Sequence, residues 1–272
     1  MSVGRTKIIA DLTSNHMGDI HVIESMIKCL AVQGVDIVKT QSWQADKLCK
    51  EVSDYQQNYK YYKKHELTEE DHIKIKEMCE EYGVEMLTTC FDLDRIEFLS
   101  TLGLKTIKVA SPDTASYTLI KRLLDRFERL IISIGATTKE ELEKTMEICE
   151  DREVVFLHCI SIYPCPLDKV NMDRMQYIRD RGFHFGYSDH TLGVEAARYA
   201  ICLGAEYVEK HFTLNRYLPG RDQKMSATID EMSEIVEWSK AVELMKGSSE
   251  PFLYDEEVGI RDKYIGKWGD NN

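Results

Sequence analysis

The sequence has no hydrophobic run long enough to cross a membrane. Its longest apolar stretches, such as LIISIGA, are far shorter than the roughly 20 apolar residues of a spanning helix. The first residues, MSVGRTKIIADL, lack the apolar core of a secretory signal. We therefore expect a cytoplasmic protein with no membrane partner.

Basic residues are few relative to acidic ones. The chain has 35 lysines and arginines against 47 aspartates and glutamates, a net charge of −12. It has no stripe of basic and aromatic residues, so a nucleic-acid partner is not expected. An anionic substrate would have to bind local basic groups.

The eight cysteines include no CxxC pair, and most lie in apolar segments, which favours reduced thiols over disulfides.

Eight short β-like runs alternate with helical patterns whose apolar residues recur three and four positions apart. This alternation favours an α/β fold, a single-domain TIM (β/α)8 barrel. An open doubly wound sheet is the alternative, but DLTSNHMGD after the first run is not its typical GxGxxG loop. We expect the barrel over residues 1–245 and a tail or linker over residues 246–272. The expected strands are residues 7–12, 36–41, 85–90, 106–111, 130–135, 154–159, 183–188 and 207–212.

Two histidines follow neighbouring strand-like runs: His190 in FGYSDHT and His211 in YVEKHFTL. The active sites of such barrels lie at the C-terminal ends of the strands. With Asp222 in the following loop, the pair is compatible with a divalent metal site, although hydrogen-bonded structural histidines fit the spacing equally well. Nitrogen and oxygen ligands suit Mn²⁺, Mg²⁺, Co²⁺ or Zn²⁺. A thiolate ligand from Cys90 or Cys159, also at strand ends, is a further option.

Polar side chains at the ends of a second group of strands are suited to binding an anion. Two lysines and three serines follow apolar runs, and the fifth run leads into a helix whose N-terminal N–H groups favour phosphate or carboxylate. Lysines, hydroxyls and a helix start together predict a phosphate-binding site. The alternative is a Schiff-base lysine, which would need no metal beside it. The residues of this group are Lys39, Lys108, Ser111, Ser133 and Ser188.

Two further segments allow two interpretations each. Asp11, Asn15 and His16 in the first loop suit hydroxyl binding or proton transfer, but Asn15 and His16 could instead cap a helix that starts near Ile20. The segment from Trp43 to about His65, rich in tyrosine and lysine, is either a loop that closes over the catalytic face or a helical excursion.

An ordered series of motifs resembles the sialic acid synthase family, over Ile8 to about Ser226. The family condenses phosphoenolpyruvate with an N-acetylated hexosamine to give nonulosonic acids. The resemblance implies a TIM barrel and cytoplasmic small-molecule chemistry in a homo-oligomer, expected to be a dimer. The motifs are ADLTSNHMGD, VKTQ, TTCFD, KVAS, SIGAT, LHCISIYPCP, GYSDHTLG, EKHFTL and PGRDQKMS.

Matching positions imply roles for individual residues. His190 and His211 would bind a divalent metal, Mn²⁺ first, with Mg²⁺ or Co²⁺ as alternatives. Asp11, Glu209 and Asp222 would be catalytic, with Asp11 near the reacting carbons. Gln41 and Tyr163 would line the sugar pocket together with Glu209 and Asp222. The phosphoenolpyruvate contacts would be Lys39, Thr89, Lys108, Ser111, Ser133, Ser161 and Ser188.

Several positions depart from the family pattern. Asp11 stands where Glu is usual, Ser161 replaces a frequent Asn, Gln223 a usual His and Cys90 a Pro. The antifreeze-like C-terminal domain that normally follows the barrel has no counterpart in the sequence, which leaves the acceptor sugar open. Two alternative functions are a related 3-deoxy sugar acid synthase with another aldehyde acceptor and a catalytically silent sugar-binding barrel.

Overall fold

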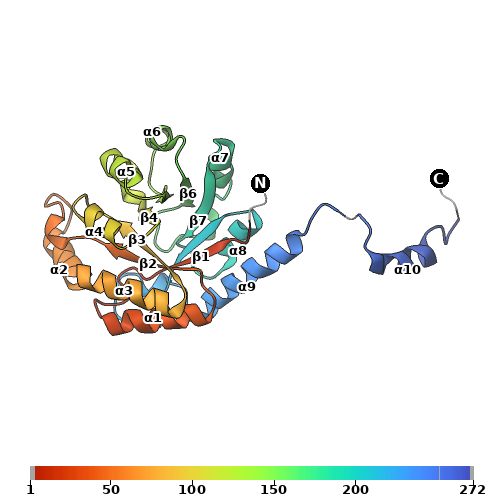
Figure 1. Cartoon of the computed structure of the whole chain (residues 1–272), viewed down its shortest axis with the longest axis horizontal. Coiled ribbons are helices and arrows are strands. Elements are labelled where there is room, and N and C mark those ends of the chain that lie inside the picture. The colour runs from red at the N-terminus through yellow and green to blue at the C-terminus, as the bar shows by residue number, and fades with distance from the viewer. Residues whose placement is uncertain (1–3, 251, 270–272) are drawn as a thin grey trace.

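A computed structural model describes residues 4–250 and 252–269. Eight parallel strands pair in chain order and close into a barrel (Figure 1). All eight expected strands are present, each within two residues of its expected bounds, so the barrel prediction is confirmed and the open-sheet alternative is wrong. The strands are β1 Lys7–Asp11, β2 Ile37–Ser42, β3 Glu85–Cys90, β4 Thr106–Val109, β5 Arg129–Ser133, β6 Val154–Cys159, β7 His184–Asp189 and β8 Tyr207–His211.

Helices cover the outside of the barrel (Figure 1). Three of them, α3, α6 and α9, begin with capping boxes at Thr68, Thr138 and Thr228, in which a threonine hydroxyl and an acidic side chain satisfy the free N–H groups of the first turn. The helices are α1 Ile20–Val32, α2 Tyr55–His65, α3 Glu69–Tyr82, α4 Arg95–Thr101, α5 Tyr117–Leu124, α6 Lys139–Cys149, α7 Arg174–Asp180, α8 Glu195–Cys202, α9 Ile229–Lys246 and α10 Asp255–Tyr264.

The barrel interior has an apolar lower layer and a polar upper layer. Side chains alternate between the two faces of a strand, so inward-facing residues recur every second position. The lower layer is a buried cluster of aliphatic side chains with one tyrosine. Two positions further along, the same face carries polar groups; for example, Ile9 is followed by Asp11 and Ile37 by Lys39. The lower layer comprises Ile9, Ile37, Leu87, Ile131, Val155, Leu157 and Tyr207.

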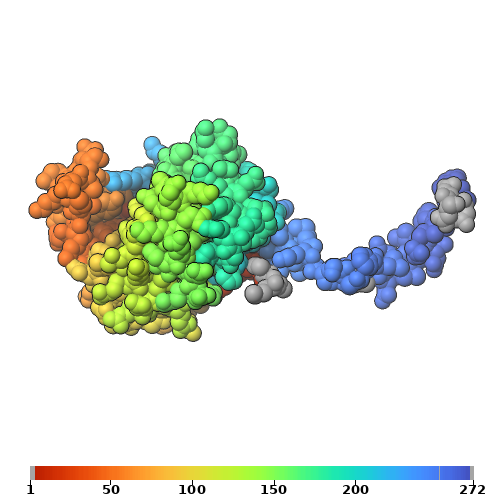
Figure 2. All heavy atoms as spheres, turned by 90° about the horizontal axis from the view of Figure 1, so that it is seen from above, coloured from red at the N-terminus to blue at the C-terminus, as the bar shows by residue number. Residues whose placement is uncertain are grey.

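The segment between β2 and α3 is helical and also leans over the catalytic face. After a 3₁₀ turn at Ala45–Lys47, α2 contacts the loop that follows β8: the Arg221 guanidinium lies 3.8 Å from the centre of the Tyr61 ring, and its Nη2 donates to Asn58 Oδ1 at 2.8 Å. Seen from above, the loop after β8 (light blue) lies against the region that contains α2 (orange) (Figure 2). The helical interpretation of the segment is confirmed, and closure over the catalytic face stays a prediction.

The chain leaves the barrel after α9. Helix α9 ends at Lys246, and α10 follows at a distance from the barrel, with no buried residue (Figure 1). The last expected tail residues, 270–272, lie outside the described part, as do residues 1–3 and 251. None of the described helices is both long and apolar enough to span a membrane.

A buried ion pair joins β7 to β8 on the outer face of the barrel. Lys210 Nζ donates to Asp189 Oδ2 at 2.6 Å and to the Thr191 carbonyl at 2.8 Å, and Asp189 Oδ1 accepts from Thr191 N and the Tyr187 hydroxyl. Both ionic side chains are at most 1% exposed. Each precedes one of the two histidines, so the pair fixes the positions from which His190 and His211 project.

We expect Lys210→Met to lower the free energy of unfolding by about 3–5 kcal/mol, because it leaves the Asp189 carboxylate buried without a counter-ion. Urea denaturation measures this. Asp189→Asn combined with Lys210→Met should recover part of the loss. Lys240→Met, which removes an exposed lysine paired with Glu237, is the control and should change little. Equal losses in Lys210→Met and Lys240→Met would contradict the assignment.

Candidate active site

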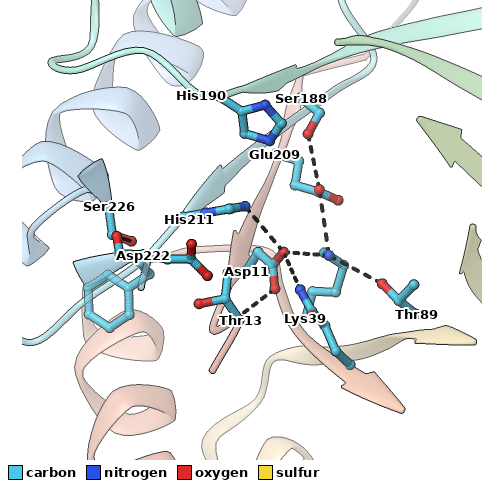
Figure 3. A network of polar contacts seen from close by, with 12 residues as sticks. Asp11, Thr13, Lys39, Thr89, Ser188, His190, Glu209, His211, Asp222 and Ser226 are labelled. Atoms are coloured by element: carbon cyan, nitrogen blue, oxygen red, sulfur yellow. Dashed lines mark hydrogen bonds and ion pairs between the residues drawn. The ribbon is translucent and has the colours of Figure 1, made fainter. Parts of the chain in front are cut away.

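Asp11 lies at the centre of the polar layer (Figure 3). Its Oδ2 accepts from Lys39 Nζ at 2.6 Å and Gln41 Nε2 at 3.2 Å, and lies 3.8 Å from His211 Nε2. Its Oδ1 accepts from Thr13 N at 2.9 Å. Burial alone would raise the pKa of Asp11, but the charge of Lys39 and the hydrogen bonds from Lys39 and Thr13 lower it below its usual value. Asp11 is thus held as a carboxylate.

Two buried lysines flank a second carboxylate, Glu209. Lys39 Nζ lies 3.6 Å from Glu209 Oε1, and Lys108 Nζ lies 3.9 Å from Glu209 Oε2. Burial opposes the charge of Lys39, but Asp11 and Glu209 raise its pKa above the usual value. Burial lowers the pKa of Lys108 to about 8, and Lys39 adds repulsion. Lys108 is therefore only weakly held in its charged form and favours an additional anion.

Hydroxyl groups surround these lysines. Lys39 Nζ lies 3.3 Å from Thr89 Oγ1, Lys108 Nζ lies 2.6 Å from Ser133 Oγ, and the Ser188 hydroxyl donates to Glu209 Oε1 at 3.1 Å. The structure thus brings the sequence-predicted lysines and most of the predicted hydroxyls together at one end of the barrel. This arrangement of donors suits a phosphate or carboxylate.

Gly135 allows two more of the predicted hydroxyls to approach. The Ser111 hydroxyl accepts from Gly135 N at 3.0 Å. A Cβ atom at position 135 would overlap the Ser161 hydroxyl and crowd Ser111 and Cys159. The close approach of these three side chains therefore requires glycine in the loop just after β5.

The two histidine rings meet edge to face at the ends of β7 and β8. Their ring centres are 5.1 Å apart, and the Tyr163 ring lies 4.2 Å from that of His190. His190 Nδ1 is 2.8 Å from the Ile160 carbonyl and 3.6 Å from Cys159 Sγ. A carbonyl that orients one ring nitrogen leaves the other for a ligand.

The histidine pair fits two nitrogen ligands of a metal. Burial lowers the pKa of His211 to about 3, so its ring is neutral, the form that binds metals. His211 Nδ1 is buried with no hydrogen-bond partner in the described structure. No group of three or more His, Cys, Asp or Glu side chains within residues 4–250 and 252–269 is arranged as a metal cage. The two imidazoles would leave the remaining coordination positions to water or substrate.

Asp222 and Tyr163 complete the predicted set. Asp222 lies beside Asp11 and His211 (Figure 3). Burial, followed by the charge of Asp11, raises the pKa of Asp222 above its usual value, so this carboxyl group can hold a proton more readily than Asp11. Tyr163 is 53% exposed at the rim. An open rim residue and a carboxyl group with a raised pKa suit the side from which a second substrate enters.

The prediction that Asn15 or His16 caps α1 is wrong. The cap is Asp19, whose side chain accepts from His21 N. Asn15 Nδ2 instead donates to the Phe212 carbonyl and to Ser226 Oγ, both at 2.8 Å, which ties the loop after β1 to the loop after β8. The buried His16 has its pKa lowered to about 4, mainly by burial, so it packs as a neutral ring.

Gln223, a departure from the family pattern, joins the same loop connection. Its Nε2 donates to the Asn15 carbonyl at 3.1 Å, and its Oε1 accepts from the Thr213 hydroxyl.

Thr13, whose backbone N–H donates to the Asp11 carboxylate, was not identified from the sequence. A left-handed residue is hard to find from sequence when it is not glycine, and Thr13 has φ 46°.

Comparison with known proteins identifies the family of the chain. Residues 26–251 match the model of the NeuB family. The chain belongs to the NeuB family. It is 33% identical to an N,N'-diacetyllegionaminic acid synthase of Legionella pneumophila, covering 93% of this chain and 77% of the relative. It is 29% identical to a pseudaminic acid synthase of Campylobacter jejuni, covering 92% of this chain and 77% of the relative.

A solved NeuB-related structure has the same fold. The N-acetylneuraminic acid (sialic acid) synthetase of Leptospira borgpetersenii, in complex with citrate, superposes with a TM-score of 0.87 at 26% identity. The match covers 97% of this chain and 93% of that one. The family resemblance noted in the sequence is confirmed.

The lowered pKa of Lys108 predicts how stability changes with pH. Between pH 8 and the ordinary lysine pKa, the folded protein binds fewer protons at this site than the unfolded chain, so Lys108 makes the protein more stable as pH rises. We expect the free energy of unfolding of the wild type to rise by about 2 kcal/mol, relative to Lys108→Met, from about pH 7.5 to about pH 10. Urea titrations at both pH values measure the difference. Parallel pH curves for the two proteins would rule this out.

Proposed function

We propose that the protein condenses phosphoenolpyruvate with the open-chain aldehyde of an N-acylated aldose to give a nonulosonic acid and phosphate. The observation that carries the proposal is the line of buried charges Asp11, Lys39, Glu209 and Lys108, which ends beside the paired imidazoles of His190 and His211. Its relatives named as legionaminic and pseudaminic acid synthases support a product of this class.

The lysine side of the site suits phosphoenolpyruvate. Lys39 has two carboxylate neighbours, whereas Lys108 has one, 3.9 Å away. Lys108, with its pKa of about 8, gains its full charge beside an added anion. The phosphate and carboxylate of phosphoenolpyruvate would bind Lys39, Lys108 and the nearby hydroxyls, which comprise Thr89, Ser111, Ser133, Ser161 and Ser188.

The histidine side suits a metal and the aldehyde. Enzymes of the NeuB family use a divalent metal in general. His190 and His211 would hold it here, and we propose Mn²⁺ first, with Mg²⁺ or Co²⁺ as alternatives. Such a metal supplies Lewis-acid polarisation of a carbonyl oxygen. Tyr163, Gln41 and Asp222 surround this side and would bind the sugar hydroxyls.

The chain's own residues would guide the bond changes. C3 of phosphoenolpyruvate attacks the aldehyde carbon, and the aldehyde oxygen takes a proton to become a hydroxyl. Water adds to C2 and loses one proton, which leaves a hydroxyl group and the phosphate on the same carbon. The bond from C2 to the phosphate oxygen then breaks, and the hydroxyl proton passes to the departing phosphate to leave the ketone. Asp222, whose pKa is raised, is suited to give and take protons, and Glu209 can accept the proton of the water. Asp11, held ionised, keeps Lys39 in place.

We expect phosphate release when the protein is incubated with phosphoenolpyruvate, Mn²⁺ and an N-acetylated hexosamine. Inorganic phosphate is measured, and the product mass separates a nonulosonic acid from a shorter 3-deoxy sugar acid. A metal-replete protein that releases no phosphate with any aldose would disprove the proposed function and favour a silent sugar-binding barrel.

The histidine pair is tested by substitution. His190→Ala and His211→Ala should each weaken Mn²⁺ binding by at least about tenfold and reduce turnover further, because each removes one of two nitrogen ligands. Electron paramagnetic resonance of free Mn²⁺ measures binding without turnover. The control is His184→Ala, at the opposite end of β7, where the ring is paired with Glu206. Unchanged Mn²⁺ affinity in both site variants would refute the ligand assignment.

A further inference from the structure

A cavity of about 340 Å³ opens beside the candidate active site, over the ends of β2 and β3. It is lined mainly by apolar and aromatic side chains from three segments of the chain. Neither the lysine group nor the histidine pair lies in it, and Gln41 is the one residue of the proposed sugar-binding set that lines it. The lining includes Trp43, Ala45, Leu48, Tyr62, Phe91 and Pro112.

The aromatic wall is ordered by its own contacts. The Trp43 ring packs edge-on against Tyr62, with centres 5.5 Å apart, and against Phe91, with centres 6.1 Å apart. Trp43 Nε1 donates to the Tyr62 carbonyl at 3.2 Å, and the Trp43 residue is only 8% exposed. The cavity is thus pre-formed, which is typical of ligand subsites.

Gln41 connects the cavity to the reacting groups. This residue lines the cavity, and its Nε2 donates to Asp11 Oδ2 at 3.2 Å. A sugar bound at Asp11 and the histidines can therefore extend a substituent past Gln41 into the cavity.

The polar groups at the cavity select the kind of substituent. Gln41 and Gln44 line it with neutral amide side chains. Neutral amides suit hydrogen bonds to another neutral polar group of a ligand. The cation at the edge, Lys47, already pairs with Asp94, so a phosphate or carboxylate substituent would find no unpaired charge there. An acyl amide offers both an N–H donor and an apolar methyl group.

We propose that this cavity binds the N-acyl group of the acceptor sugar, with the acyl methyl between Trp43, Tyr62 and Phe91 and the amide beside the side chains of Gln41 and Gln44. This inference rests on the proposed function for the identity of the acceptor. It predicts that acceptor choice depends on the acyl group.

Two exposed cysteines give a test that does not require turnover. Cys49 lines the cavity, whereas Cys202 lies on α8, away from it. The wild-type protein, with Mn²⁺, is treated with iodoacetamide in the presence of N-acetylmannosamine or of mannose, which lacks the acyl group. Peptide mass spectrometry follows the two alkylation rates, and phosphate release with phosphoenolpyruvate is measured on the same preparation.

We expect N-acetylmannosamine, at about ten times its Kd, to slow alkylation of Cys49 about tenfold, since protection grows as one plus the ratio of ligand to Kd. Mannose should protect much less, and Cys202 should react equally in all samples. Equal protection of Cys49 by both sugars, or by neither, would overturn the subsite even if phosphate is released. Selective protection without phosphate release would support the subsite while the proposed function fails.

A variant that fills the cavity provides the second measurement. Leu48→Trp should raise KM for N-acetylmannosamine roughly tenfold, because the acyl methyl loses its space, and should leave KM for phosphoenolpyruvate unchanged. Leu203→Trp, a partly exposed leucine that follows α8, is the matched control. A Leu48→Trp protein that folds, as judged by circular dichroism, and keeps the wild-type KM for the sugar would contradict the proposal.

Discussion

Closure of the barrel between β1 and β8 pairs Asp11 with Lys39 on one side and with His211 on the other. The candidate site depends on this closure, because Lys39 and His211 are far apart in sequence and meet only through β1. In a closed barrel, inward-facing residues share one interior, so a change of one residue in register would turn these side chains outward. The buried apolar lower layer fixes that register, and the polar residues above it follow.

The arrangement of buried charges has an energetic consequence. Asp11, Lys39, Glu209 and Lys108 are all at most 3% exposed, and buried ions stabilise a fold only when each is well paired. Lys39 has two carboxylate neighbours, while Lys108 lies 3.9 Å from one. The incompletely compensated lysine is the group that an anionic substrate would stabilise. The incompletely compensated charge of Lys108 lowers the stability of the free protein, and an anionic substrate that pairs with it would bind more tightly for that reason.

Much of this could be predicted from the sequence, because alternation in strands depends on local residues. The eight strands and the polar residues at their ends followed from that pattern. Features that depend on contacts between loops did not: the cavity around Trp43 needs three segments to meet, and Asn15 bonds to residues after β8 rather than capping α1. The Asp189–Lys210 pair was also missed, because outward-facing charges on a strand normally indicate solvent exposure, whereas here helices cover them.

The central claim is that the polar layer joins C3 of phosphoenolpyruvate to an aldehyde and releases phosphate by breaking the bond between C2 and oxygen. The most direct measurement uses phosphoenolpyruvate labelled with ¹⁸O in the bridging position, with Mn²⁺ and an N-acetylated hexosamine. The account predicts that mass spectrometry finds the label in inorganic phosphate and ordinary oxygen from water in the product ketone. Label retained in the ketone would contradict it.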